Sequence, residues 1–200
     1  MFTGLVQHVG RVIDRCPIEG GQRLRLDPQG WDYEPLAGAS VAVEGCCLSL
    51  VQSSEREWSF DVIPQTLRVT TLGSLEAGAS VNLEHAALAE TLLGGHLVQG
   101  HVDCVGVVTA AGEVGDEYRC RVEFDPGYDA LVVSRGSVAV SGVSLTVAAR
   151  GHGWLEVALI PTTLRETTLG GLTGGGRVNL EFDVFAKMIE RQLDLRGTDG

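Results

Sequence analysis

The chain contains the same segment twice. Residues 62–84 read VIPQTLRVTTLGSLEAGASVNLE, and residues 159–181, displaced by 97 positions, read LIPTTLRETTLGGLTGGGRVNLE. The two segments align without a gap, and 15 of their 23 positions are identical. The chain is therefore an internal duplication, and each copy is expected to fold in the same way.

The duplication extends beyond these two segments. Residues 40–50 align with residues 137–147 at the same displacement, and residues 4–10 align with residues 100–106 at a displacement of 96. A solenoid needs at least three short repeats, so two long copies predict two small domains. We expect an N-terminal domain over residues 1–95, a C-terminal domain over residues 96–183 and a separate tail over residues 184–200.

The chain is acidic, with a formal net charge of −11 from 15 basic and 26 acidic side chains. This balance argues against a nucleic-acid partner, because phosphate backbones are bound by clustered Lys and Arg. No apolar run reaches the roughly 18 residues of a membrane span, and the first residues lack the pattern of a secretory signal. We therefore expect no membrane partner either. The five cysteines have no metal-like spacing, which indicates reduced thiols in a cytoplasmic protein and no metal site.

Each copy has the pattern of a series of short strands. Val and Leu alternate with polar residues, and 27 glycines are available for tight turns. Pro64 and Pro161 each predict the start of a short helix before the last strand of their copy. Six strands and one short helix per copy predict a mostly β chain, built as two tandem six-stranded antiparallel barrels. The first strands are expected to begin at Leu5 and Val98.

Two segments without a counterpart in the repeat are predicted to be helical. The linker over residues 86–95 predicts a short helix that ends at its paired glycines. In the tail, Phe185, Met188, Ile189 and Leu193 fall on one face of a helix, with charged residues on the other side. This apolar stripe predicts packing on another subunit or back on a barrel, and the sequence leaves both open.

The two copies differ where chemistry could take place. Cys47 of the first copy aligns with Ser144 of the second, and Leu5 aligns with His101. An imidazole titrates near neutral pH, so a paired hydroxyl and imidazole would suit general acid–base catalysis. Each of these residues alone also fits a purely structural role. The residues by themselves predict a duplicated barrel that binds two similar small ligands, one in each copy.

Several longer motifs point to a known family. The chain begins MFTG and carries GCCL at residues 45–48, GHLVQGHVD at residues 95–103, GVSLT at residues 142–146 and VNLEFD at residues 178–183. Over residues 1–191, these motifs and the two copies of IPxTLRxTTLG resemble riboflavin synthases of the alpha-chain type, a family of duplicated lumazine-binding barrels. The resemblance implies two lumazine-binding barrels and a C-terminal helix, assembled as a homotrimer. It also makes lumazine synthase a candidate partner.

The resemblance implies an activity as well. Two molecules of 6,7-dimethyl-8-ribityllumazine exchange a four-carbon unit, which gives riboflavin and 5-amino-6-(ribitylamino)uracil without a cofactor or a metal. In the family, the first barrel of one subunit faces the second barrel of its neighbour, and each holds one lumazine. One lumazine loses a proton from its C7 methyl group, the other is activated by addition at C7, and the carbanion attacks. The alternative is a carrier of the same fold that binds lumazine or flavin without turnover.

The resemblance also assigns site residues position by position. Catalytic roles are implied for His101, Ser144, Cys47, Thr146 and Asp183. Substrate contacts are implied for Gly4, Leu5, Val6, Cys47, Leu48, Ser49, Asp61, Val62, Ile63, Pro64, Gln65, Thr66, Gly100, His101, Val102, Arg135, Ser144, Leu145, Thr146, Ala158, Leu159, Ile160, Pro161, Thr162 and Thr163. Because His101 faces an aligned leucine in the first copy, the proton-transfer groups are expected mostly in the second barrel.

Four positions depart from the family pattern. Ser141 stands where an Asp is usual, Glu44 where an Asn is common, and Ser49 where a Thr is common. Arg135 replaces a Lys, which keeps the charge and changes its geometry. The change at Ser141 matters most, because it removes a carboxylate beside the expected pocket and could slow turnover or reshape the turn.

Overall fold

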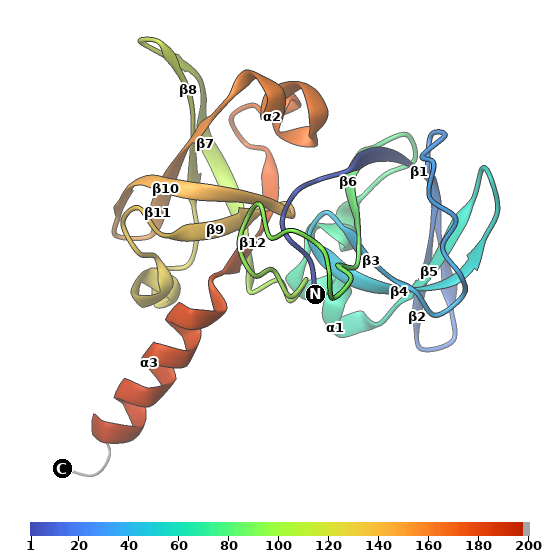
Figure 1. The fold of residues 1–200 in the computed structure, drawn as a ribbon, viewed down its shortest axis with the longest axis horizontal. Helices are drawn as coiled ribbons and strands as arrows, with labels where there is room; N and C mark the ends of the chain where they lie inside the picture. Colours follow the sequence, from blue (N-terminus) through green and yellow to red (C-terminus); the bar gives the residue numbers. More distant parts are fainter. Residues whose placement is uncertain (198–200) are drawn as a thin grey trace.

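The computed structural model describes residues 1–197, and residues 198–200 of the expected tail lie outside the described residues. The chain folds into two closed six-stranded antiparallel barrels followed by a C-terminal helix (Figure 1). The predicted fold class is confirmed. The first barrel has the strand order β1-β2-β5-β4-β3-β6, and the second has the equivalent order β7-β8-β11-β10-β9-β12.

The strands of the two barrels correspond one to one. Those of the first barrel are β1 (His8–Ile18), β2 (Gly21–Asp27), β3 (Ser40–Val43), β4 (Cys46–Ser53), β5 (Trp58–Val62) and β6 (Ser80–His85). Those of the second are β7 (Cys104–Val114), β8 (Glu117–Glu123), β9 (Ser137–Val140), β10 (Val143–Gly151), β11 (Trp154–Leu159) and β12 (Arg177–Phe182). Even the bulges match, because β1 is irregular between Val12 and Asp14 and β7 between Val108 and Ala110.

A short helix follows β5 and β11, as the sequence predicts. α1 (Pro64–Val69) and α2 (Pro161–Glu166) each begin with a proline, whose fixed φ suits the first helical position. A 3-10 turn follows each of them, η1 (Thr71–Ser74) and η3 (Thr168–Gly171). A third such turn, η2 (Pro126–Leu131), precedes β9.

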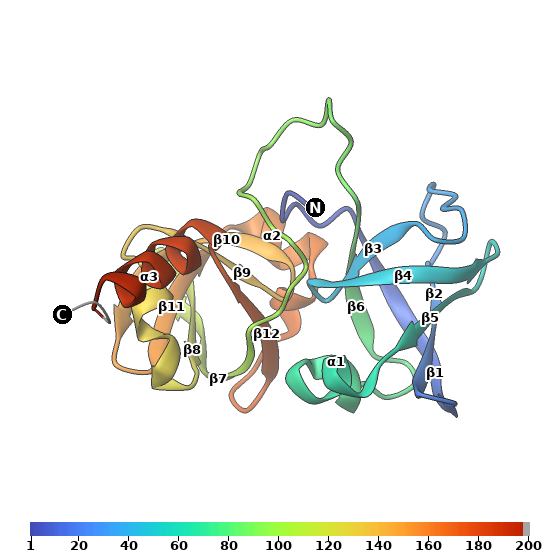
Figure 2. The ribbon, with the colours of Figure 1, turned by 90° about the horizontal axis from the view of Figure 1, so that it is seen from below.

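The connection between the barrels differs from the prediction. Residues 86–95 contain no helix and form a loop that stands out from the barrels (Figure 2). The predicted helix is wrong because a short helix is marginal unless an apolar face packs on something, and the leucines of this loop are exposed. The first strands also begin later than predicted, at His8 rather than Leu5 and at Cys104 rather than Val98.

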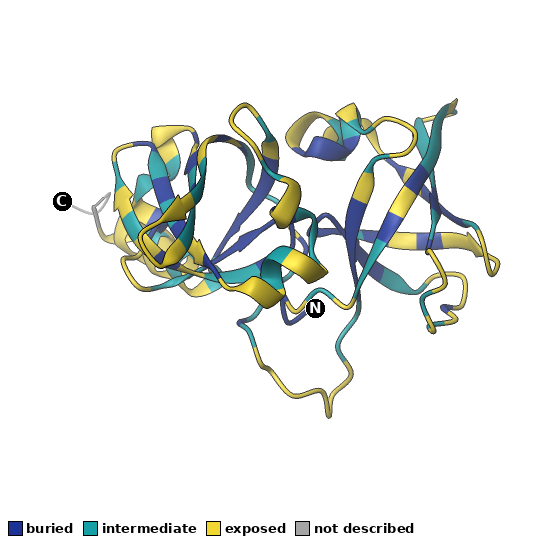
Figure 3. Cartoon of the chain, turned by 90° about the horizontal axis from the view of Figure 1, so that it is seen from above, coloured by how far each residue is buried: buried dark blue, intermediate teal, exposed yellow. Residues whose placement is uncertain are grey.

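Each barrel has its own apolar core. Buried residues alternate with less buried ones along strands such as β4 and β11 (Figure 3), as expected when one face of a strand lines a barrel. The strands β3, β6, β9 and β12 are instead buried at nearly every position. A third and smaller apolar cluster joins the barrels and consists of Phe2, Ala42, Val98 and Ala139. Phe2 and Val98 also exchange backbone hydrogen bonds of 2.7 and 3.1 Å, so the N-terminus is paired with the connection between the barrels.

The two barrels touch at the turns between β3 and β4 and between β9 and β10. Gly45 and Gly142 face each other across this contact, with φ angles of +76° and +83°. A Cβ atom on Gly45 would lie 2.5 Å from the backbone nitrogen of Gly142, and one on Gly142 would lie 2.8 Å from that of Gly45. Only glycine combines this backbone conformation with the absence of a side chain that the contact requires.

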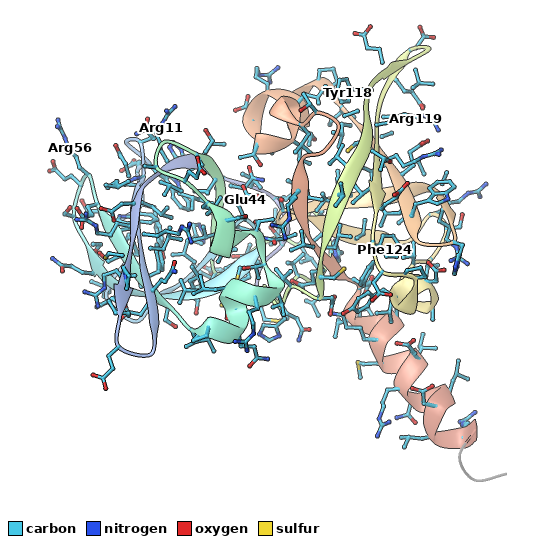
Figure 4. The ribbon with its side chains drawn as sticks, turned by 180° about the vertical axis from the view of Figure 1, so that it is seen from behind. Arg11, Glu44, Arg56, Tyr118, Arg119 and Phe124 are labelled. Atoms are coloured by element: carbon cyan, nitrogen blue, oxygen red, sulfur yellow. The ribbon has the colours of Figure 1, made fainter. Side chains whose placement is uncertain are left out.

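Polar groups reinforce the same contact. The side chain of Asn82 donates to the carbonyl oxygen of Ser141 at 2.9 Å, and Asn179 donates to that of Glu44 at 2.8 Å. Glu44 lies between the barrels (Figure 4), where its buried carboxylate accepts the N–H of Asn82 at 2.7 Å and the hydroxyl of Thr168 at 3.2 Å. The Ser141 side chain also hydrogen-bonds to this carboxylate, and burial raises the pKa of Glu44. Glu44 of the opposite turn therefore places a carboxylate beside Ser141, the position where the family usually has an Asp.

The C-terminal helix α3 (Val184–Gly197) projects away from both barrels (Figure 1). Phe185, Met188, Ile189 and Leu193 are each 61% exposed, so the apolar stripe does not fold back on a barrel. Of the two alternatives for this stripe, the structure therefore excludes the intramolecular one. Within residues 1–197, the helices are too short or too polar to cross a membrane.

Candidate functional site

Two extended segments, one before the first strand of each barrel, cross to the opposite barrel. We call residues 2–6 the first strap and residues 98–102 the second strap. Val6 packs against the core of the second barrel, and Val102 packs against the core of the first. The two halves of the chain therefore exchange these segments, which also explains why the first strands begin later than predicted.

The first strap joins β6 to β10. The carboxylate of Glu84 accepts the N–H of Thr3 at 2.6 Å, the hydroxyl of Thr3 at 2.7 Å and the N–H of Gly4 at 3.0 Å. The carbonyl oxygen of Gly4 accepts the N–H of Ser144 at 2.7 Å. Gly4 has a φ of +74°, and a Cβ there would lie 2.5 Å from Cβ of Ser144, so this contact requires glycine.

The second strap joins β12 to β4 in the same way. The carboxylate of Glu181 accepts the N–H groups of Gln99, Gly100 and His101 at 2.6, 2.9 and 2.9 Å. The carbonyl oxygen of Gly100 accepts the N–H of Cys47 at 2.8 Å, and a Cβ on Gly100 would lie 2.5 Å from Cβ of Cys47. Burial raises the pKa of Glu181, whereas the three N–H groups favour its charged form.

This exchange corrects the predicted arrangement of the site residues. His101 belongs to the second copy, but both of its chain neighbours contact the first barrel, Gly100 at the N–H of Cys47 and Val102 at the core. Leu5, its aligned counterpart, lies in the strap that contacts Ser144 of the second barrel. Within one chain, the prediction that His101 supplies the imidazole of the second barrel is therefore wrong. The alignment matched the copies correctly and carried no information on which barrel each strap contacts.

The imidazole beside Ser144 is that of His96, which is not among the predicted site residues. Nδ1 of His96 lies 2.6 Å from Oγ of Ser144, and the residue is only 9% exposed. Nε2 is buried and has no hydrogen-bond partner in the described part of the chain. Burial lowers the pKa of His96, and the negative charge of Asp183 works against this shift. In its neutral form the ring can accept the proton of the serine hydroxyl as a base, or donate a hydrogen bond to its oxygen in the other tautomer.

Two of the predicted catalytic residues are thus placed near each other, together with a residue that was missed. Ser144 hydrogen-bonds to His96, and the charge of Asp183 raises the pKa of the same ring. Asp183 also accepts the N–H of Phe185 at 2.9 Å, where α3 begins. The motif at residues 95–103 contains His96, so the motif itself was the signal that could have identified it.

The two neighbouring cysteines of β4 differ in their environment. Cys46 is 5% exposed and belongs to the core of the first barrel, where burial raises its pKa to about 12. Cys47 points the other way, is half-buried and lies against Gly100 of the second strap. Because a thiol reacts through its thiolate, Cys46 is unreactive and Cys47 is the thiol available at the first-barrel site.

The other predicted residues fall into two groups around these contacts. β4 is antiparallel to β5, with Leu50 opposite Phe60, and β10 is antiparallel to β11, with Val147 opposite Val157. The start of β4 therefore lies beside the end of β5, and the start of β10 beside the end of β11. The first-barrel group comprises Cys47, Leu48, Ser49, Asp61, Val62, Ile63, Pro64, Gln65, Thr66, Gly100, His101 and Val102. The second-barrel group comprises Gly4, Leu5, Val6, Arg135, Ser144, Leu145, Thr146, Ala158, Leu159, Ile160, Pro161, Thr162, Thr163 and Asp183.

Not every member of these groups exposes its side chain. Leu48, Val62 and Leu159 are at most 6% exposed and belong to the barrel cores, so they can meet a ligand only through their backbone. Ile63 and Ile160, at the starts of the two short helices, are 57% and 63% exposed. Exposed apolar side chains of this kind are typical of surfaces that bind a flat ring.

Two charged members of the groups are constrained. Arg23 donates two hydrogen bonds to Asp61, at 2.7 and 2.9 Å, and this partner lowers the pKa of Asp61. Arg135 has a φ of +64°, where the first copy has Gly38 with a φ of +87°. A non-glycine residue in this region costs about 1–2 kcal/mol, and such strain clusters at functional positions.

A cavity in the first barrel contains none of the residues of either group. It has a volume of about 1060 Å³ and is lined by Trp31, Tyr33 and Trp58 with acidic side chains of the neighbouring loops. A smaller cavity of about 460 Å³ includes Val6 of the first strap together with Arg165 and Glu166 of α2. Within residues 1–197, no group of His, Cys, Asp and Glu side chains is arranged to hold a metal ion.

The chain is similar to proteins of known family. A model of the lumazine binding domain matches it twice, over residues 3–86 and 99–183. The riboflavin synthase of Mycobacterium tuberculosis is 41% identical over 201 residues, which cover 98% of this chain and 100% of that protein. The chain belongs to the riboflavin synthase family. Another member, the riboflavin synthase of Bacillus subtilis, is 33% identical over 193 residues, which cover 96% of this chain and 90% of that protein.

Solved structures of a lumazine- and flavin-binding protein have the same fold as this family member. LumP complexed with 6,7-dimethyl-8-(1'-D-ribityl) lumazine has a TM-score of 0.80 and 26% identity, with 90% of this chain and 98% of LumP covered. LumP complexed with riboflavin has a TM-score of 0.82 and 28% identity, with 92% and 100% covered. The duplicated barrel thus holds both a lumazine and a flavin in LumP.

Proposed function

We propose that the chain converts two molecules of 6,7-dimethyl-8-ribityllumazine into riboflavin and 5-amino-6-(ribitylamino)uracil. The observation that supports this best is the pair of equivalent strap contacts, Gly100 with Cys47 and Gly4 with Ser144, which give the chain two similar sites. A reaction between two identical molecules needs two similar sites. The two products together contain every atom of the two substrates, so the transfer of the four-carbon unit needs neither an oxidant nor a reductant.

We further propose that the two sites perform different steps. One lumazine must lose a proton from its methyl group, and the other must be activated by addition, so the two sites need different side chains. The second-barrel site has the Ser144–His96 pair for proton transfer, and the first-barrel site has the exposed His101 and the Cys47 thiol. Holding two rings face to face contributes further, by as much as roughly 7–11 kcal/mol in favourable systems.

The assembly that we propose is a homotrimer in which the first-barrel site of one subunit faces the second-barrel site of its neighbour. Its support is that Ile63 and Ile160 are exposed, one in each group of predicted site residues, and that α3 exposes an apolar stripe that does not pack on its own barrel. We also propose a cytoplasmic location, supported by five unpaired cysteines, which suit a reducing compartment. An association with lumazine synthase remains a proposal from the family resemblance, and copurification of the two proteins would test it.

The purified chain should form riboflavin from 6,7-dimethyl-8-ribityllumazine with no added metal or cofactor. One riboflavin is expected for every two lumazine molecules consumed, because the second product keeps the remaining carbon atoms. Absorbance spectra recorded over time measure both compounds. A chain that binds the lumazine tightly but forms no riboflavin would be a carrier like LumP rather than an enzyme.

Loss of the apolar stripe on α3 should reduce assembly and turnover together. The Phe185→Ser/Ile189→Ser variant keeps the helix and removes two exposed apolar side chains, so its mass in light scattering should fall from three chains towards one. Turnover should fall as well, since each open site would lose the surface that covers it. A chain ending at Asp183 should behave in the same way. If both variants keep the mass of the unmodified chain, α3 does not hold the subunits together.

A further inference from the structure

Lys187 is the only lysine of the chain, and it lies where α3 leaves the second barrel. Its ammonium group is 2.7 Å from Oδ2 of Asp103, and the two side chains are only 24% and 18% exposed. The same oxygen accepts the N–H of Phe182 at 2.8 Å, and the N–H of Asp103 donates to the carbonyl oxygen of Leu180 at 2.8 Å. Asp103 is therefore tied to β12 through its backbone and its side chain, and to α3 through Lys187.

Asp103 directly follows the second strap, and Glu181 accepts three N–H groups within that strap. Lys187 acts on this second carboxylate too, because its positive charge counters the effect of burial on the pKa of Glu181. One ammonium group thus compensates two shielded carboxylates that fix the strap at His101 and at its end. Shielded carboxylates are costly without a cation nearby, so loss of this ammonium group would weaken both attachments.

We propose that Lys187 is a positioning residue for the first-barrel site: it holds the second strap in place, and the strap holds His101 beside Cys47. This inference rests on the proposed function, because the position of His101 matters for turnover only if the chain catalyses the transfer. It also connects assembly to chemistry. The helix that exposes the apolar stripe also carries Lys187 in its first turns. A shift of α3 on assembly would therefore reach the strap through the contact between Lys187 and Asp103.

Three substitutions on α3 test this role. Lys187→Met removes the charge and keeps an unbranched side chain, Lys187→Arg keeps the charge, and Arg191→Met removes an exposed charge from the same helix as a matched control. In Lys187→Met, the amides of residues 99–101 should exchange their hydrogens faster by on the order of tenfold. Turnover should fall by on the order of ten- to a hundredfold with a smaller change in KM, because misplacement by about 1 Å has effects of that size. The other two variants should stay near the unmodified chain.

Each readout separates one part of the inference from the others. Unchanged exchange at residues 99–101 in Lys187→Met would overturn the role of Lys187 in holding the strap. Faster exchange with unchanged turnover would overturn the link between the strap and His101. If the unmodified chain forms no riboflavin, the proposed function fails, and the exchange comparison still decides whether Lys187 holds the strap. Lys187→Gln serves for the same measurements if methionine prevents folding.

Discussion

Gly45→Ala is expected to lower the free energy of unfolding by about 3–5 kcal/mol, which combines backbone strain with a clash that cannot relax. The new Cβ would lie 2.5 Å from the nitrogen and 2.8 Å from Cα of Gly142. Both atoms belong to the backbone, so no side-chain rotation relieves the contact. The barrels would have to move apart, which would also stretch the hydrogen bonds that Asn82 and Asn179 make across the contact.

Gly78→Ala is the matched control for this substitution. Gly78 has a φ of +86°, close to the +76° of Gly45, but a Cβ there would have no atom within 4 Å. It should therefore cost only the backbone strain, about 1–2 kcal/mol. Urea unfolding followed by tryptophan fluorescence gives both values, and their difference measures the contact between the barrels. Equal losses in the two variants would mean that the close approach of Gly45 and Gly142 contributes nothing to stability.

His96→Ala should lower the turnover number by about two to four orders of magnitude, the usual contribution of a general acid or base. The ring is the partner of the Ser144 hydroxyl, at 2.6 Å, and alanine can neither accept nor donate a proton. Because burial lowers the pKa of His96 below its ordinary value, the ring is neutral at pH 7. Turnover should therefore hold down to about pH 6.5, the ordinary pKa of histidine, and fall only as the ring gains a proton below it.

A double substitution decides whether His96 and Ser144 act together. If they form one proton-transfer unit, His96→Ala, Ser144→Ala and the double variant should lose similar amounts of turnover. Losses that multiply would instead show two independent contributions. His152→Ala is the matched control, because this histidine is 85% exposed and paired with Asp129 on a surface loop. An undiminished turnover number for His96→Ala would reduce the 2.6 Å contact to a structural role.

The fold was largely predictable because the duplication restricts it so strongly. Two copies that share 15 of 23 residues in one segment must share a fold. The alternation of apolar and polar residues then predicts the strands, and the two prolines predict the starts of the short helices. The linker was predicted incorrectly, because its helical pattern depends on a packing partner that residues 86–95 do not have. Local preference decides secondary structure only where packing agrees with it.

The site was less predictable, for a topological reason. Cys47 and Ser144 were recognised as equivalent positions, but the identity of their neighbours depends on where the straps cross. The first strap is held by the carboxylate of Glu84 and the second by that of Glu181. In the sequence, both residues only mark the ends of predicted strands. His96 precedes the second strap and has no counterpart in the first copy, so comparing the copies could not identify it.

The exchange of the two straps also bears on how such a chain could arise. Each barrel is completed by residues that belong to the other half, as in a symmetric dimer whose members trade their first residues. Joining the end of one member to the start of the next would turn that dimer into a single polypeptide with every contact retained. Residues 86–95 would then be the linker that joined two ancestral chains, which fits their exposed path. A chain with only one half of this sequence would have to dimerise to complete its barrel.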